Sequence, residues 1–536
     1  MLLRGTAIVS VLTLLSRLLG FVRDLLVAQL LGASLFADAF FVAFRIPNLL
    51  RSFAAEGALT SAFVPVFSSA LAQGKDHAIE TCKRVVGFVL CLTVPLSIVG
   101  ALFAHEIVGL IAPGFSEDPA KRDLAASLTQ LMMPYIICVS LIAIVNSALN
   151  SLKIFGASAW AQVTMNLVLI AGALCALPFD KRTATVILAL SVLVGGIAQV
   201  LAQLPACRRT GISLLPSKKL FSPEVRDVAR LMLPATVGAS VYQITIFLGT
   251  LMASLLGEGS ISWLFYADRV AQFPIGIFSI ALASVLLPTL ANASATSDSD
   301  RFRTALGDSL RFTSFIIIPT SAGMWALAEP ITQLLFQRGS FSPHSTLMTA
   351  NAIRALALGL WGTSCYSMIS RAFIARKDTI TPTFIGLCSL IMYLLSAVTF
   401  MGPIPQSSGL LVDFLVALQR FMTTVAPSTP ALGHVGIALA SSIASLGALL
   451  LAALIFSRRY GQFPWRTFTH STVKSLAASL VMIAALQFLR APGSSPLLTL
   501  LTGIPLGALL YAIISMLLRS HEVRDTLAVI RKLRRS

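Results

Sequence analysis

The sequence predicts an all-α polytopic membrane protein. Of its 536 residues, 56% are hydrophobic and only 12% are charged, and apolar runs of membrane-spanning length recur along the chain. Prolines and turn motifs return after a nearly constant interval, which indicates a duplication. We therefore expect about 14 transmembrane helices. They would form two six-helix lobes related by a parallel repeat, followed by two extra C-terminal helices.

Each expected span is long enough to cross the bilayer at about 1.5 Å per residue. We expect a break near Pro47 in the second span, because proline removes a helical hydrogen bond. The first span is not expected to be a signal peptide, because Arg17, Arg23 and Asp24 interrupt its apolar stretch. The expected spans are 6–32, 35–72, 84–112, 124–150, 156–178, 184–206, 228–256, 260–294, 304–328, 345–374, 379–402, 433–457, 471–489 and 496–518.

Lysines and arginines divide unequally between the loops on the two sides of the membrane. The side that holds the N-terminus collects 25 of the 40, the other side has 7, and the remaining 8 lie within spans. Because basic loops stay in the cytoplasm, both termini are expected to be cytoplasmic. Topology also explains the net charge of +18, so nucleic acid is not an expected partner.

The duplication is clearest in a turn motif and in the spacing of prolines. The run LLGASLFADAFFVAFRIPNLL from Leu30 resembles LLGEGSISWLFYADRVAQFPIGIF from Leu255, 225 residues later, and Pro95 and Pro319 are 224 residues apart. Each repeat holds six spans, an even number, so the lobes share one orientation and an axis along the membrane normal would relate them. The expected lobes are 1–215 and 216–459. The remaining part, 460–536, adds two helices and a basic cytoplasmic tail without a counterpart in the repeat.

Three segments lie outside the bilayer pattern. Ser222 and Pro223 predict the N-cap and first residue of a helix that leads from the linker into the second lobe. The 403–432 loop contains an amphipathic helix that we expect on the outer surface of the membrane. The basic tail from Arg519 is expected to contact anionic lipid on the cytoplasmic leaflet. The apolar positions of the 403–432 helix are Leu410, Leu411, Phe414, Leu415, Leu418 and Phe421.

Cysteine and histidine are scattered rather than clustered. The chain has seven cysteines and six histidines, with no CxxC or HExxH pattern among them. We therefore expect no disulfide framework, no metal site and no cofactor.

Seven charged residues interrupt the first two apolar spans. A charge at the centre of a membrane helix costs about 2.5–3.5 kcal/mol, so seven facing lipid would cost on the order of 20 kcal/mol. A polar cavity between helices accounts for them better, and the surplus of arginine favours an anionic ligand. The seven are Arg17, Arg23, Asp24, Asp38, Arg45, Arg51 and Glu56.

Three arginines are candidates to bind one phosphate group from both lobes. Arg23 and Arg51 lie in the first lobe, and Arg269 follows Asp268 in the YADR motif of the second. Guanidinium groups suit phosphate because they donate two parallel hydrogen bonds. Adjacent helical residues point about 100° apart, so Arg23 and Asp24 are not expected to pair simply with each other.

The other charges in these spans have less definite roles. Arg17 precedes Asp24 by two turns on the same face and would orient it. Asp38 lies near the outer end of its span, where either a gate or simple solvation would account for it. Arg45 and Glu56 are expected to be structural.

Four long motifs resemble one known family. They are SRLLGFVRD from Ser16, DAFFVAFRIPNLLR from Asp38, AEGALTSAFVPVF from Ala55 and YADRVAQFPIGIFSIALASVLLPTL from Tyr266. They are similar to the MviN/MurJ family of bacterial lipid II flippases, within the multidrug/oligosaccharidyl-lipid/polysaccharide exporter superfamily. The resemblance covers essentially the whole chain.

The resemblance implies a transport function without enzymatic chemistry. The protein would move lipid II, the undecaprenyl-pyrophosphate-linked precursor of peptidoglycan, from the cytoplasmic to the periplasmic leaflet of the bacterial inner membrane by alternating access. Its partners would be lipid II, membrane lipids and other cell-wall synthesis or division proteins, and its role would extend to cell shape. The resemblance also implies that the last two helices form a groove for the polyprenyl tail. The binding residues that it implies are Arg17, Arg23, Asp24, Asp38, Arg51, Asp268 and Arg269.

One family feature is not matched. Some members are described as having a sodium site built from acids in the seventh and eleventh spans, but 228–256 and 379–402 contain no acid here. A sodium-coupled cycle is therefore not expected from these spans, and membrane potential or another coupling stays open.

Alternatives from other classes remain open. A drug or cation exporter of the same superfamily would be expected to line its site with carboxylates, whereas this interior is richer in arginine. An intramembrane prenyl-phosphate transferase would need a metal-binding motif such as DDxxD, which the sequence lacks. A non-transporting scaffold for cell-envelope proteins would leave the interior charges without a purpose.

Overall fold

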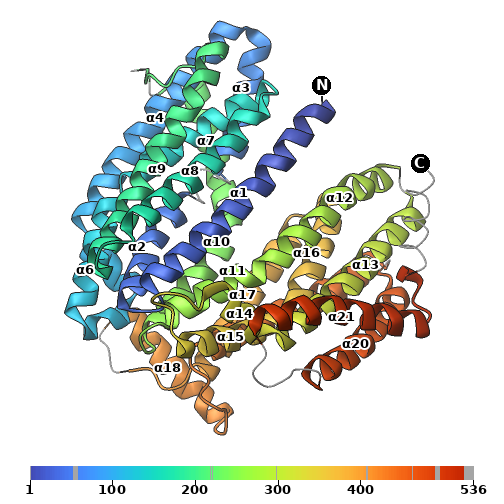
Figure 1. Cartoon of the computed structure of the whole chain (residues 1–536). Helices are drawn as coiled ribbons and strands as arrows, with labels where there is room; N and C mark the ends of the chain where they lie inside the picture. Colours follow the sequence, from blue (N-terminus) through green and yellow to red (C-terminus); the bar gives the residue numbers. More distant parts are fainter. Residues whose placement is uncertain are drawn as a thin grey trace. The chain divides into compact units, whose positions relative to one another are not determined.

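The structure, a computed structural model, is helical in every regular element of its described part, which confirms the all-α class (Figure 1). It describes residues 2–51, 58–217, 219, 221–296, 298–405, 409–461, 463–488 and 495–523. Within these, the side chains of 2–8, 50, 51, 58, 233–240, 242, 277 and 279–285 are not described.

Many helices have the length and composition of membrane spans, as expected for a polytopic membrane protein. Within the described residues, eight pass this test, and α13 (Ser299–Ala326) with α14 (Ala328–Phe336), bent by 71°, would make a ninth. The total of about 14 spans stays a prediction. The eight are α4 (Lys75–Leu102), Pro119–Ser151, α8 (Phe155–Ala176), α9 (Lys181–Thr210), α17 (Ile380–Phe400), α19 (His434–Tyr460), α20 (Trp465–Phe488) and α21 (Pro496–Leu517).

Helix boundaries recur at the interval found in the sequence. Both α4 and α13 have 28 residues, and residue 299 lies 224 positions after residue 75. Lys153 and Lys377, also 224 positions apart, both have a left-handed backbone, with φ of 63° and 61°. This conformation is uncommon for residues other than glycine, so the two copies share an unusual turn. Further pairs are α5 (Ala104–Ile111) with α14, α6 (Pro119–Met132) with α15 (Pro343–Ala357), α7 (Tyr135–Ser151) with α16 (Leu360–Ala375), and α8 with α17.

The helices around the two motif prolines differ from each other. The helix α2 (Leu35–Arg51) ends four residues after Pro47, and residues 52–57 lie outside the described part, so the break expected near Pro47 stays a prediction. Membrane helices tolerate proline because neighbouring groups can satisfy the freed carbonyl. In the second copy, α11 (Ser260–Pro274) ends at its proline and is followed by a π-helical turn, η3 (Ile275–Ser279), and by α12 (Ile280–Ala295).

The chain forms two compact units. The first contains Met1–Ser262, Arg338–Ser342 and Pro405–Gly409, and the second contains Trp263–Gln337, Pro343–Ile404 and Leu410–Ser536. The linker helix α10 (Pro223–Ser254) belongs to the first unit, where it packs against α3 (Ala58–Gln73) and α4. Packing and sequence repetition therefore divide the chain differently, and the lobes 1–215 and 216–459 stay a prediction.

The first unit is built from α1 (Leu2–Leu31) to α10, with a 3₁₀ turn, η2 (Pro113–Glu117), before α6. One of its cores includes Phe63 and Phe67 of α3, Val85 of α4 and Val228 of α10, all of which are almost fully buried. These closely packed aromatic and branched side chains hold the helices together through van der Waals contacts, which remain favourable within a bilayer.

The predicted start of the linker helix is confirmed. The Ser222 hydroxyl accepts a hydrogen bond from the backbone N–H of Val225 at 3.4 Å, and Pro223 is the first residue of α10. The Nη1 atom of Arg84 donates to both carboxylate oxygens of Glu224 at 3.2 Å. A hydrogen bond from Ser222, together with the charge of Arg84, lowers the pKa of the Glu224 carboxyl despite its partial burial. These contacts fix α10 to α4.

The last two helices pack on the second unit through α13 (Figure 1). The Tyr511 hydroxyl of α21 donates to the backbone carbonyl of Phe315 at 2.8 Å and lies 3.2 Å from the hydroxyl of Ser475 on α20. The outward sides of the pair are apolar, with Leu480 65% exposed and Leu501 64% exposed. Such surfaces suit contact with lipid.

Candidate functional site

An ion pair that the sequence argument did not expect lies inside α1. The Nε and Nη2 atoms of Arg23 donate to Oδ1 of Asp24 at 2.9 and 2.7 Å. The Arg23 side chain is 16% exposed and that of Asp24 is 7% exposed. The prediction that these neighbours do not pair simply with each other is therefore wrong. The arginine side chain is long and flexible enough to bend across the angle between adjacent positions, and low solvent exposure strengthens the attraction.

A second partner of Arg23 comes from α8. Its Nη1 atom donates to Oδ1 of Asn166 at 3.1 Å, and the Asn166 amide donates to the backbone carbonyl of Ser16 at 2.9 Å. A Cβ atom at Gly20 would lie 3.5 Å from Oδ1 of Asn166, so α1 and α8 approach closely here. The sequence argument missed Asn166, although a carboxamide within an apolar span was a signal of a buried polar contact.

The structure gives fewer contacts for the other arginines of the first two spans. Arg17 is exposed, and the ion pair of Asp24 is made with Arg23. Arg51 is the last residue of α2, and its side chain lies outside the described residues, as does the whole of Glu56. Arg45 donates to the backbone carbonyl of Ile246 on α10 at 3.3 Å, in agreement with a structural role.

Asp38 occupies a fully formed polar site at the start of α11. Its side chain is 1% exposed and accepts from Lys121 Nζ at 2.9 Å. It also accepts from the backbone N–H groups of Gly259 and Ser262 at 2.9 and 3.0 Å, and from the Ser262 hydroxyl at 2.6 Å. Asp38 therefore caps α11 from another helix and neutralises Lys121.

A second carboxylate makes the reverse contact. Oε1 of Glu258, just before α11, accepts from the backbone N–H of Leu35, the first residue of α2, at 2.8 Å. Each helix start thus receives a carboxylate from the chain segment of the other, and we call these two contacts the reciprocal caps. Gly32, at φ 64°, precedes α2, and a Cβ atom there would lie only 2.3 Å from the carbonyl oxygen of Ser340. The turn therefore needs glycine.

The YADR residues lie in the second unit on α11. Asp268 is exposed and accepts a short hydrogen bond from Nε2 of Gln272, one turn later. The Arg269 guanidinium lies 4.8 Å from the ring centre of Phe265, at cation–π distance. That Arg23, Arg51 and Arg269 converge on one phosphate group stays a prediction.

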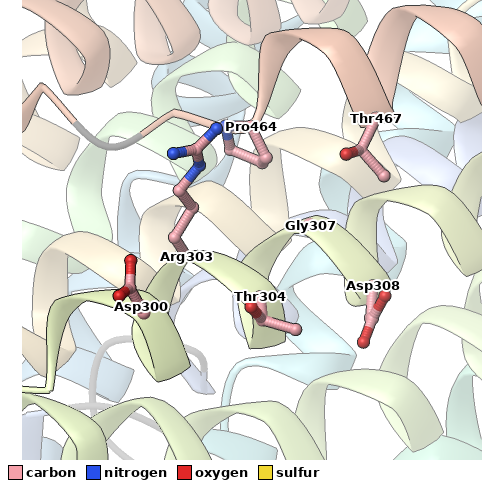
Figure 2. Close-up of a pocket in the computed structure, with 7 residues that line it drawn as sticks. All are labelled: Asp300, Arg303, Thr304, Gly307, Asp308, Pro464 and Thr467. Carbon is pink, nitrogen blue, oxygen red and sulfur yellow. The ribbon is translucent and has the colours of Figure 1, made fainter.

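A surface pocket of the second unit is separate from these predicted residues. It lies between the first turns of α13 and the start of α20, as Figure 2 shows. Asp300, Thr304 and Asp308 are spaced four residues apart on α13 and therefore share one helix face. With two carboxylates beside one guanidinium, the pocket has no cationic surplus for a phosphate. Its lining residues are Asp300, Arg303, Thr304, Gly307, Asp308, Pro464 and Thr467.

Comparison with known proteins identifies the family. The family described as "Lipid II flippase MurJ" matches residues 27–412. The protein called "Lipid II flippase MurJ" from Burkholderia cenocepacia is 37% identical over 414 residues, which cover 76% of this chain and 80% of that one. This chain belongs to the lipid II flippase MurJ family. Another member of the MurJ family, the "Probable lipid II flippase MurJ" of Buchnera aphidicola from Acyrthosiphon pisum, is 33% identical over 487 residues, or 90% of this chain and 89% of its own.

Solved structures agree with this assignment. A structure described as "Lipid II flippase MurJ, inward closed conformation" has a TM-score of 0.79 and 26% identity, and the match covers 97% of this chain and 99% of that chain. A MATE family transporter of the MOP superfamily in an inward-facing conformation has a TM-score of 0.62 at 16% identity, covering 89% and 96%. The second likeness concerns the fold alone. The polytopic membrane architecture of the MurJ family is therefore the architecture of this chain.

Proposed function

We propose that this chain moves lipid II from the cytoplasmic to the periplasmic leaflet of the bacterial inner membrane. The observation that carries the proposal is the family match over residues 27–412, together with relatives named as lipid II flippases. The partly buried Arg23 fits this function, because a membrane helix keeps a guanidinium only where a partner or ligand repays its desolvation.

The Arg23–Asp24 pair suggests how the protein binds and releases an anionic head group. With no substrate present, Asp24 supplies the negative charge that makes burial of Arg23 tolerable. A diphosphate would replace that carboxylate as the partner of the guanidinium. Since the replaced carboxylate stays next to it, Asp24 would compete for Arg23 again and favour release. This exchange binds and frees the head group without making or breaking a bond.

We propose alternating access between the lobes 1–215 and 216–459, with the polyprenyl tail remaining in lipid. The substrate site would combine Arg17, Arg23, Arg51 and Arg269 with nearby Asp24, Asp38 and Asp268. In this proposal the last two helices provide a groove for the tail. Their exposed apolar sides support that role.

The direct test is a leaflet-resolved assay with purified lipid II in proteoliposomes. We expect the protein to accelerate exchange of lipid II between leaflets over protein-free vesicles, and the experiment is run with and without an imposed membrane potential. Efflux of an organic cation from the same vesicles is measured in parallel. Cation efflux without lipid II exchange would replace this proposal with that of a drug exporter.

The proposed topology places both termini in the cytoplasm and 403–432 outside. In a variant without the seven native cysteines, we expect Ser428→Cys to react with a membrane-impermeant thiol reagent in intact spheroplasts. Lys219→Cys is expected to react only after the membrane is opened. Both positions are exposed, so access to the reagent decides the result. The opposite labelling pattern would reverse the orientation and with it the assignment of the basic loops.

A further inference from the structure

The helix α18 (Leu410–Val425) has an apolar side that is exposed in the described part of the chain. Leu410, Phe414, Phe421 and Val425 are 84%, 54%, 62% and 64% exposed. At about 100° per residue, these four positions fall within about 60° of the helix circumference, and no polar residue shares that arc. We call these four side chains the apolar stripe.

The opposite side of α18 is fixed to the second unit. Val412 and Leu415 are 1% and 3% exposed. The Gln419 amide donates to the backbone carbonyls of Val398 at 3.2 Å and Gly402 at 2.6 Å. The expected single apolar face is thus divided, because Leu415 packs inward while Phe414 points outward. The apolar stripe has a fixed orientation and is not a face that merely lacks packing.

The contacts of Gln419 also set the depth of α18. They hold it against the last turn of α17, which is a candidate membrane span, and α18 is followed by the candidate span α19. A helix fixed to the end of a span lies where hydrocarbon gives way to head groups. Asp413 and Arg420 are exposed on a flank about 100° from the apolar stripe, as in helices that lie in the membrane plane.

We propose that α18 lies along the periplasmic leaflet, with the apolar stripe inserted among the lipids and the Asp413–Arg420 flank facing water. A protein partner fits this surface less well, because a stable protein interface takes about 20–30 residues on each side. The apolar stripe supplies four. The proposal goes beyond transport itself: α18 anchors the outer end of α17, and hence the second unit, at a fixed depth in the bilayer. It does not depend on the identity of the substrate.

Tryptophan reporters on the two sides of α18 test this arrangement. Phe414→Trp places the reporter in the apolar stripe, and Thr423→Trp places a matched one at an exposed position of the last turns, about 170° around the helix from the centre of the stripe. Both full-length variants are reconstituted one copy per nanodisc, and the emission of the unsubstituted protein, with its five tryptophans, is subtracted. We expect the F414W emission to be blue-shifted, quenched by brominated phospholipid and protected from iodide. The T423W emission should be quenched by iodide and unaffected by brominated lipid.

Two results would overturn the proposal. Equal iodide quenching of F414W and T423W would mean that the stripe faces water. Protection of F414W that appears only with two copies per nanodisc would mean that it covers another copy of the chain. Val425→Trp serves as a second reporter in the stripe, so a local defect at position 414 cannot decide the outcome alone.

Discussion

Replacing Arg23 with alanine is expected to abolish complementation of a strain depleted of its own lipid II flippase, while the variant stays in the membrane at near-normal abundance. The guanidinium is the group that would hold the diphosphate, and alanine retains neither its charge nor its hydrogen-bond donors. Growth on depletion and an immunoblot of membranes measure the two quantities. Arg182→Ala, at an exposed position of α9, is the matched control and should complement fully.

A second variant separates binding from packing at this position. Loss of Arg23 removes the guanidinium partner of the buried Asp24, and breaking a buried ion pair costs about 3–5 kcal/mol. Asp24→Asn in the Arg23→Ala background removes the carboxylate charge as well. If the arginine holds substrate, the double variant is stable and still inactive. Restored growth would show that Arg23 serves only to neutralise the charge of Asp24. Complementation by Arg23→Ala, Arg51→Ala and Arg269→Ala alike would rule out the proposed arginine site.

Replacing Asp38 with alanine is expected to lower the thermal unfolding temperature of the purified protein strongly. The change leaves Lys121, 11% exposed, without this carboxylate and removes the cap of α11. Breaking a buried pair costs about 3–5 kcal/mol, and a lost cap about 0.5–2 kcal/mol. Asp123→Ala is the control, because its ion pair with His105 is exposed and contributes little.

A pair of charge-removing variants tests whether Asp38 also binds substrate. Asp38→Asn with Lys121→Met removes both charges while the amide oxygen can still cap α11. If Asp38 only joins helices, this double variant should recover much of the stability and of the transport. Stability without transport would place Asp38 in the substrate site. Full stability of Asp38→Ala would contradict the bonding described for this carboxylate.

The helices could be predicted because the length of each apolar run and the repetition of motifs along the sequence indicate them directly. The repeated pair α4 and α13 lies where the proline spacing places it, and the cap of α10 follows from Ser222 and Pro223. The exact residue at which α2 ends could not be predicted in this way, because the one hydrogen bond lost at Pro47 does not decide where a helix supported by neighbouring groups stops.

The sequence argument selected candidate site residues, whose binding role stays a prediction, but it did not predict their contacts. Charge in an apolar span identified Arg23 and Asp24 as groups that need partners. For Asp38 the suggested simple solvation is wrong, because its side chain is 1% exposed and bonded to Lys121. Their partners Asn166 and Lys121 come from distant parts of the chain, which periodicity does not connect. The angle between adjacent helical residues excluded the Arg23–Asp24 pair wrongly, because it describes where Cα–Cβ bonds point and ignores the reach of a long side chain.

The compact units and the sequence repeats describe different properties of the chain. Similarity between the repeats reports how the gene was assembled, whereas compact units report which helices now bury surface against each other. The linker helix α10 therefore counts with the second repeat by sequence and with the first unit by packing.

The reciprocal caps make the junction between the starts of α2 and α11 cooperative. Asp38 serves the α11 start while Glu258 serves the α2 start, so separating the two segments removes the carboxylate acceptor from both helix starts in one event. At the buried Asp38 end, a partial displacement would forfeit these bonds without giving water enough room to replace them. We therefore expect the starts of α2 and α11 to be either in contact or fully separated, with few molecules at intermediate distances between them.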